Sequence, residues 1–136
     1  ARLIQLEEEY FRDRKNASSQ RIGGPPYTIP VVFHIVHQGG PENISDAAIQ
    51  TSLDFLNQSF ANTGPYDPTT GVPTDVSFCL AKRTPEGTLS SGIERINNSL
   101  SSLDMSEDLQ LKNLSRYDPT QYLNIWVVGD ICGSIG

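Results

Sequence analysis

Residues 28–37 read Thr-Ile-Pro-Val-Val-Phe-His-Ile-Val-His, and this stretch decides the fold. Most of its side chains are β-branched or aromatic, which is typical of a β-strand. Apolar side chains stand at both odd and even positions, so we expect both faces of the strand to be buried, as in the centre of a parallel sheet. Pro30 is compatible with the strand because it lies near the beginning, where a missing backbone N–H is tolerated.

The residues that follow this strand predict an amphipathic helix over residues 46–61. Ser45 is a good N-cap, and the carboxylate of Asp46 suits the positive end of the helix dipole. Apolar side chains then recur every three or four positions and form one stripe, which consists of Ile49, Leu53, Leu56 and Phe60. We therefore expect this helix to cover one face of the sheet.

The rest of the chain alternates between strand and helix patterns. We expect strands over residues 76–81, 93–96 and 122–128, and a short helix over residues 106–114 with Ser106 as its cap. This alternation predicts an α/β fold with a partly parallel sheet.

The first 21 residues differ from the rest in pattern and in charge. Residues 1–15 show the helical spacing of apolar side chains, and a linker rich in glycine and proline follows them. Residues 1–21 carry five of the ten basic groups of the chain but only four of its sixteen acidic groups. This layout suits a detachable segment and equally an ordinary N-terminal docking helix. We therefore divide the chain into an N-terminal segment, residues 1–21, and a body, residues 22–136.

The length and charge of the chain exclude several classes of protein. The chain has 136 residues, which is the size of one domain. Its net charge of −6 argues against sequence-independent binding to nucleic acid, which needs a basic surface. No apolar run approaches the roughly 18 residues of a membrane span. We therefore expect neither nucleic acid nor a membrane as a partner.

Few side chains offer chemistry. His34 and His37 are the two histidines of the sequence, and their spacing directs them to opposite faces of one strand. We expect them to be hydrogen-bonded or half-exposed strand residues rather than ligands of one metal ion. The sequence has no His-x-x-x-His pair and no Cys-x-x-Cys pair, so we assign no zinc site and no catalytic residue. Cys79 and Cys132 are either joined in a disulfide or remain buried free thiols, and the sequence leaves both open.

The predicted sheet raises a question of coverage. The strands at residues 28–37 and 122–128 are apolar on both faces, and the helix at residues 46–61 covers only one of them. No other predicted helix of the body is long enough to cover the second face, and an uncovered apolar face is unfavourable in water. We therefore expect that more polypeptide C-terminal to Gly136, or a partner, completes the domain.

Six segments, in order along the chain, resemble the first part of the catalytic domain of the pappalysin and cytophagalysin zinc metallopeptidases, which are metzincins. The segments are residues 27–37 (Tyr-Thr-Ile-Pro-Val-Val-Phe-His-Ile-Val-His), 42–50 (Glu-Asn-Ile-Ser-Asp-Ala-Ala-Ile-Gln), 56–60 (Leu-Asn-Gln-Ser-Phe), 76–81 (Val-Ser-Phe-Cys-Leu-Ala), 92–95 (Gly-Ile-Glu-Arg) and 117–127 (Tyr-Asp-Pro-Thr-Gln-Tyr-Leu-Asn-Ile-Trp-Val). The resemblance covers residues 27–136 and is strongest to the secreted bacterial members.

This resemblance implies a metzincin-like N-terminal subdomain, in which a twisted, mostly parallel sheet is backed by the helix at residues 46–61. It implies hydrolysis of a peptide or protein substrate by a zinc-activated water, with zinc as cofactor and calcium as a further candidate ion. The family's zinc motif, His-Glu-x-x-His-x-x-Gly-x-x-His, is absent from this sequence. We therefore expect the fold to be incomplete here and the zinc-binding helix to lie C-terminal to Gly136, in the same polypeptide or as a separate chain. Alone, this chain is expected to be inactive.

Two further site predictions rest on the resemblance. Four residues would enter the edge strand that forms the upper rim of the substrate cleft, namely Gly133, Ser134, Ile135 and Gly136. Residues 1–21 resemble the end of a pro-segment, which implies a secreted zymogen. No cysteine precedes Cys79, so we hypothesise that a carboxylate, that of Asp13 or one from Glu7 to Glu9, maintains latency. Two alternatives remain open: a non-catalytic binding module that lacks the zinc helix, and an inhibitor that acts in trans through residues 1–21.

Overall fold

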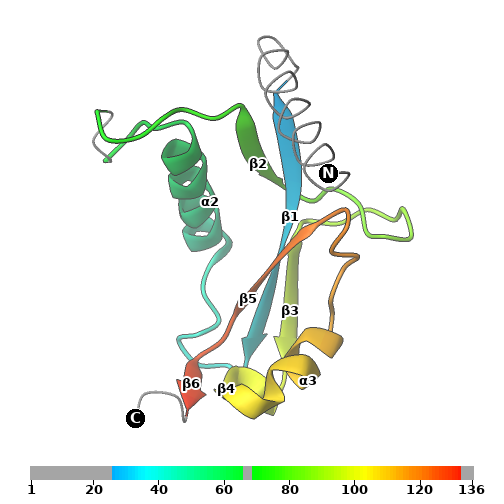
Figure 1. Ribbon diagram of the computed structural model, residues 1–136. Coiled ribbons are helices and arrows are strands. Elements are labelled where there is room, and N and C mark those ends of the chain that lie inside the picture. The colour runs from blue at the N-terminus through cyan, green and yellow to red at the C-terminus, as the bar shows by residue number, and fades with distance from the viewer. Residues whose placement is uncertain (1–25, 66–68, 133–136) are drawn as a thin grey trace, which may run out of the picture.

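A parallel sheet with one long helix against it forms the centre of the molecule (Figure 1). The structure is a computed structural model, and it describes residues 26–65 and 69–132. The sheet contains β1 (Tyr27–His37), β2 (Val76–Leu80), β3 (Ile93–Asn97) and β5 (Leu123–Val127), and all pairings with β1 are parallel. The predicted α/β fold class is confirmed, and each of these strands lies where its sequence pattern placed it.

Strand β1 is the centre of the sheet, as its two-sided apolar pattern predicted. Val31 pairs with Leu80 of β2 and also with Leu123 of β5, so these two strands lie on opposite edges of β1. Phe33 pairs with residues of β3 and β5 in the same way. Strands β2 and β3 therefore follow one another along a single edge of β1, as two halves of an interrupted strand. Residues 31–36 of β1 are all buried.

The interruption between β2 and β3 is a local excursion of the chain. It leaves the sheet after Ala81, whose N–H donates to the carbonyl of Val31 at 2.8 Å. It returns at Gly92, whose carbonyl accepts from the N–H of Phe33 at 2.8 Å. An antiparallel bridge between Arg83 and Leu89 closes the excursion at its base.

Helix α2 (Asp46–Phe60) covers one face of the sheet, as predicted. The hydroxyl of Ser45 caps its first turn by accepting from the N–H of Ala48 at 3.2 Å. The apolar stripe of the helix meets the odd-numbered side chains of β1 and forms a core with them. The buried members of this core are Val31, Phe33, Ile35, Ile49, Leu53 and Phe78.

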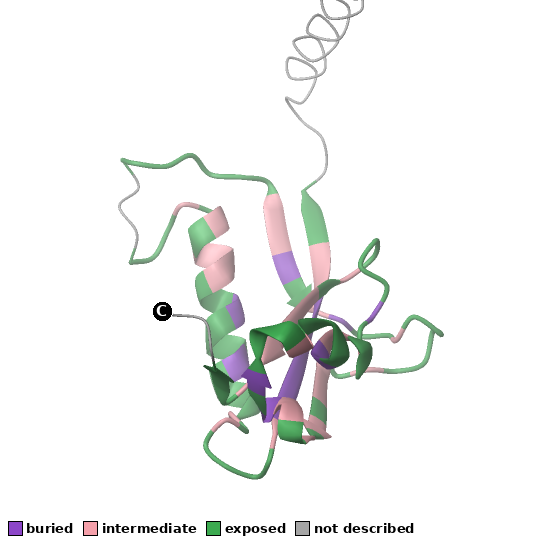
Figure 2. Cartoon of the chain, turned by 60° about the horizontal axis from the view of Figure 1, so that its bottom comes forward, coloured by how far each residue is buried: buried purple, intermediate pink, exposed green. Residues whose placement is uncertain are grey.

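The second face of the sheet is also covered, and our expectation of an open apolar face was wrong. The connection from β3 to β5, residues 98–122, passes across this face; we call it the crossover segment. It contains the 3-10 turns η1 (Ser99–Ser101) and η2 (Met105–Glu107), strand β4 (Ser102–Asp104) and helix α3 (Asp108–Asn113). Figure 2 shows buried stretches in this part of the chain. The buried apolar side chains of the crossover segment are Leu103, Leu111 and Tyr117, and the first two belong to one core cluster with Val36 of β1. Several short elements thus do together what we had assigned to one long helix.

Local details of the crossover segment also differ from expectation. The cap at residue 106 was wrong: Asp104 caps this region, because its carboxylate accepts from the N–H of Ser106 at 2.9 Å. Glu107 bonds back to the N–H of Asp104 at 3.0 Å and completes a capping box. The sequence pattern also missed a small second sheet, in which β4 pairs in parallel with β6 (Asp130–Cys132).

Two predictions about the ends of the chain lie outside the described residues, namely the helix at residues 1–15 and the separate segment at residues 1–21. Among the helices that the structure describes, none is both long and apolar enough to cross a lipid bilayer.

Candidate functional site

The predicted substrate-binding rim, Gly133 to Gly136, follows β6 immediately but lies outside the described residues, as does Asp13. The structure does describe how the chain reaches that point. The N–H of Gly129 donates to the carbonyl of Ser101 at 2.9 Å, and β6 then pairs with β4. A side chain at Gly129 would meet Ser101 and Glu42 at 3.2–3.4 Å, so the approach is close. The crossover segment therefore sets the direction in which the chain leaves toward residue 133.

The loop after β1 lies beside this exit and carries a carboxylate. The Oε1 atom of Glu42 accepts from the backbone N–H of Gln38 at 2.7 Å and from that of Gly40 at 3.2 Å. These hydrogen bonds, first that from Gln38, lower the pKa of Glu42 below its ordinary value. A general base that works near neutral pH needs a raised carboxyl pKa. Glu42 is therefore a loop-ordering residue and is not poised for proton transfer.

Both cysteines are free and exposed in the structure, so neither the disulfide nor the buried thiols suggested by the sequence are observed. Cys79 lies on β2, whereas Cys132 lies on β6 in the smaller sheet, and the fold does not bring them together. The thiol of Cys132 donates to Oδ2 of Asp130 at 2.7 Å, and this hydrogen bond raises its pKa. Because the thiolate is the reactive form, Cys132 is not an activated nucleophile.

His34 is fully buried on the face that the crossover segment covers. Its Nε2 atom lies 2.9 Å from Oδ1 of Asn124, and its Nδ1 atom lies 2.7 Å from the hydroxyl of Ser115. The ring stacks on Trp126 with centroids 4.8 Å apart and meets the edge of Tyr117 at 5.8 Å. The prediction that this histidine is a hydrogen-bonded strand residue is confirmed.

The amide of Asn124 settles which nitrogen of His34 carries the proton. Its Oδ1 atom also accepts from the backbone N–H of Tyr117 at 2.9 Å, and its Nδ2 atom donates to the carbonyl of Tyr117 at 3.0 Å. The oxygen therefore faces His34, so Nε2 must be the donor and Nδ1 must accept from Ser115. Burial lowers the pKa of His34, against the opposing effects of Asn124 and Glu94, so the neutral form is favoured.

Tyr117 extends this cluster to β3. Its hydroxyl donates to Oε1 of Glu94 at 2.6 Å. Burial, and then the hydrogen bond to Glu94, raise the pKa of the Tyr117 hydroxyl, so it remains protonated. The sequence contained one signal for this cluster that we did not use: Asn124 is a polar residue inside the otherwise apolar strand at residues 122–128.

Neither histidine belongs to a group of side chains, among the described residues, that could hold a metal ion. Both ring nitrogens of His34 are engaged within the protein, and Nδ1 of His37 accepts from the N–H of Gly39 at 3.1 Å. Within residues 26–65 and 69–132, no three His, Cys, Asp or Glu side chains are grouped so that they could hold a metal. These residues therefore do not fit a zinc ion, and no chemistry that depends on zinc can be assigned to them.

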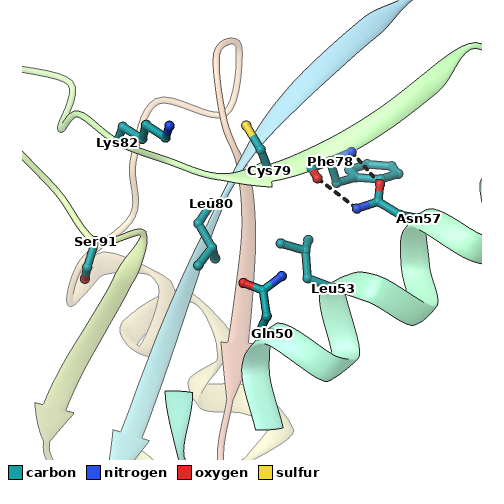
Figure 3. A pocket seen from close by; sticks show the side chains of 8 residues that line it. All are labelled: Gln50, Leu53, Asn57, Phe78, Cys79, Leu80, Lys82 and Ser91. Carbon is teal, nitrogen blue, oxygen red and sulfur yellow. Dashed lines mark hydrogen bonds between the residues drawn. The ribbon is translucent and has the colours of Figure 1, made fainter. Parts of the chain in front are cut away.

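Three pockets lie among the described residues, and none of them combines the side chains of a typical acid–base site. One, of about 420 Å³, lies between α2 and β2, with Gln50, Leu53 and Leu80 in its lining (Figure 3). Two further pockets, of about 420 and 330 Å³, share Pro30, Gln121 and Tyr122 in their linings. None of these three pockets is lined by a histidine or a carboxylate. The described residues thus form a scaffold, and strand β6 leads the chain from this scaffold toward residue 133.

The fold of this chain is similar to that of several solved structures. One similar structure is mirolysin in complex with compound 9, with a TM-score of 0.67 and 31% identity, and the match covers 79% of this chain. Another is the mature mirolysin of Tannerella forsythia in complex with a cleaved peptide, with a TM-score of 0.65 and 30% identity, and the match covers 76% of this chain. A promirolysin mutant of the same organism is also similar, with a TM-score of 0.64 and 29% identity, and the match covers 90% of this chain. No family model and no curated protein matches the chain. This chain spans 43–44% of the length of those structures. The neighbours are forms of mirolysin, a metallopeptidase of the metzincin class, and the fold of this chain matches the N-terminal part of a catalytic domain of that kind.

Proposed function

We propose that this chain is the N-terminal part of the catalytic domain of a secreted, zinc-dependent endopeptidase of the pappalysin and cytophagalysin branch. The observation that carries the proposal is the parallel sheet backed by α2, which resembles mirolysin at 31% identity with a TM-score of 0.67. The six collinear segments support the choice of branch.

In this proposal the zinc ligands come from polypeptide beyond Gly136, in the same chain or as a separate one. The described residues do not form a zinc site. Both ring nitrogens of His34 are hydrogen-bonded within the protein, and His37 lies on the opposite face of β1. The role of this chain is then to hold the sheet and to present a rim for a peptide or protein substrate. Calcium is not part of the proposal.

We assign that rim to Gly133, Ser134, Ile135 and Gly136. The assignment is supported by the position of β6, which is exposed at all three residues and leads directly into this segment. A strand at a sheet edge binds an extended peptide through backbone hydrogen bonds, which makes small side chains acceptable there. The mature mirolysin structure that resembles this chain holds a cleaved peptide.

We further propose that residues 1–21 are the end of a pro-segment and that Asp13 contributes to latency. The likeness to the promirolysin mutant covers 90% of this chain, whereas the likeness to mature mirolysin covers 76%. The wider coverage in the pro-form supports a pro-segment at the N-terminus.

The test is metal and mass analysis of the protein isolated from its natural source. We expect about one zinc per molecule and hydrolysis of a quenched fluorescent peptide library that a zinc chelator abolishes. Intact mass under denaturing conditions then shows whether the remaining polypeptide is continuous with this chain or separate from it. A sample that contains only a species of 14.9 kDa, without zinc and without hydrolysis, would contradict the proposal and favour a binding module.

A further inference from the structure

One side chain, His34, joins the sheet to the crossover segment. It belongs to β1, at the centre of the sheet, and its Nε2 donates to Asn124 on the neighbouring strand β5. Its Nδ1 accepts from Ser115, which lies in the crossover segment just after α3. The imidazole therefore bonds to both layers, in the middle of a face that excludes water.

This arrangement depends on a neutral imidazole. Nε2 already donates, so a second proton must be added at Nδ1, where the Ser115 hydroxyl now donates. That hydroxyl would have to turn around and accept, and the new positive charge would be buried against Trp126. Protonation therefore weakens the contact between the two layers.

The groups that face His34 do not offset such a charge. From β5 it faces the neutral side chains of Asn124 and Trp126, and from the crossover segment those of Ser115 and Tyr117. The charged group that acts on it is Glu94 of β3, and Oε1 of this carboxylate already accepts from the Tyr117 hydroxyl. Burial outweighs the attraction of Glu94, because the pKa of His34 is lowered overall.

We propose that His34 is an acid-sensitive latch, which holds the crossover segment against the sheet when neutral and releases it when protonated. The segment is well suited to partial release, since only a few buried side chains anchor it and its helix α3 has six residues. Strand β4 belongs to the segment and pairs with β6, so release also loosens the chain that leads to residue 133. The latch is independent of the proposed peptidase function.

The direction of the pH dependence follows from the lowered pKa. Well above pH 6.5, the ordinary pKa of histidine, His34 is neutral in both the open and the closed form, and closure is most favourable. As pH falls through 6.5, His34 binds a proton in the open form but remains neutral in the closed form, so closure becomes less favourable. One proton changes the opening equilibrium by at most about tenfold per pH unit. The loss levels off once pH falls below the lowered pKa of the closed form.

Hydrogen exchange of the complete protein tests the latch. Opening of residues 98–122 is measured between pH 7.5 and 5.0, corrected for the intrinsic pH dependence of exchange, with α2 as internal reference. We expect opening of the crossover segment to rise below pH 6.5 while α2 stays protected. His34→Gln should remove this rise, and the matched control His37→Gln should keep it.

Several results would overturn the latch. They are an unchanged crossover segment in the wild-type protein, a pH-dependent rise that persists in His34→Gln, or a rise that disappears in His37→Gln. If His34→Gln does not fold, NMR titration of the wild-type imidazole decides. An His34 resonance that titrates at or above pH 6.5 contradicts the latch, and one that titrates below it, together with the wild-type exchange result, supports it.

Discussion

Gly92 shows how a single residue permits the interrupted strand. Its φ angle is +75°, a left-handed conformation that side chains rarely adopt. A Cβ atom at this position would lie 2.8 Å from the backbone nitrogen of Ala81. That nitrogen is held by its hydrogen bond to β1 and cannot move aside without breaking the ladder. Glycine is therefore required here for two separate reasons, conformation and space.

We predict that Gly92→Ala destabilises the protein by about 3 kcal/mol, as the sum of left-handed strain and a backbone clash. Gly87→Ala is the matched control. Gly87 has a φ angle of +86°, but nothing lies within 4 Å of its added Cβ, so we expect a loss of only about 1 kcal/mol. Urea unfolding of both variants measures the difference. Equal losses would show that the contact with Ala81 relaxes without cost.

At the scale of elements, helix α2 is fastened to the sheet by more than apolar contacts. The side-chain amide of Asn57 donates to the carbonyl of Phe78 at 2.9 Å and accepts from the N–H of the same residue at 2.7 Å (Figure 3). Strand β2 pairs with β1 on its other side. The amide therefore satisfies backbone groups on the outer edge of β2, as a further strand would do.

We predict that Asn57→Ala costs about 2 kcal/mol, because it removes two hydrogen bonds and leaves part-buried backbone groups of Phe78 without their partner. Gln50→Ala, on the same helix, removes only an exposed hydrogen bond to Asp54 and should change stability by less than about 0.5 kcal/mol. Denaturant unfolding compares the two variants. A loss for Asn57→Ala no larger than that of Gln50→Ala would mean that water replaces the amide freely.

At the scale of the whole molecule, the sheet is covered on its two faces by different means. A regular helix lies on one face, and short turns with single anchors lie on the other. Helix α3 contributes one leucine to the core and leaves another at the surface. Leu111 is 4% exposed and anchors the helix, whereas Leu109 is 64% exposed.

We predict that Leu111→Ala destabilises the protein by about 3 kcal/mol, because it leaves a cavity against Val36 and Leu103. Leu109→Ala should change stability by less than about 0.5 kcal/mol. Thermal or urea unfolding of the complete protein provides the measurement. If both substitutions are equally mild, the crossover segment does not seal the second face, and another part of the protein must cover it.

The sequence by itself determined the central strand, the long helix and the parallel α/β class, because strand alternation, helical periodicity and capping are properties of neighbouring residues. The two-sided apolar pattern of residues 28–37 was sufficient to place β1 at the centre of the sheet. The same local patterns identified β2, β3 and β5 within one or two residues.

Only the tertiary structure decided that β2 and β3 share one edge, that the crossover segment covers the second face and that Cys79 and Cys132 lie in different sheets. It alone also decided the state of His34, whose partners Ser115 and Asn124 lie 81 and 90 positions away along the chain. No periodicity reports such pairs, because they arise only when distant segments pack and exclude water. The charge of a buried histidine is a property of that packing, and it is therefore decided by the fold.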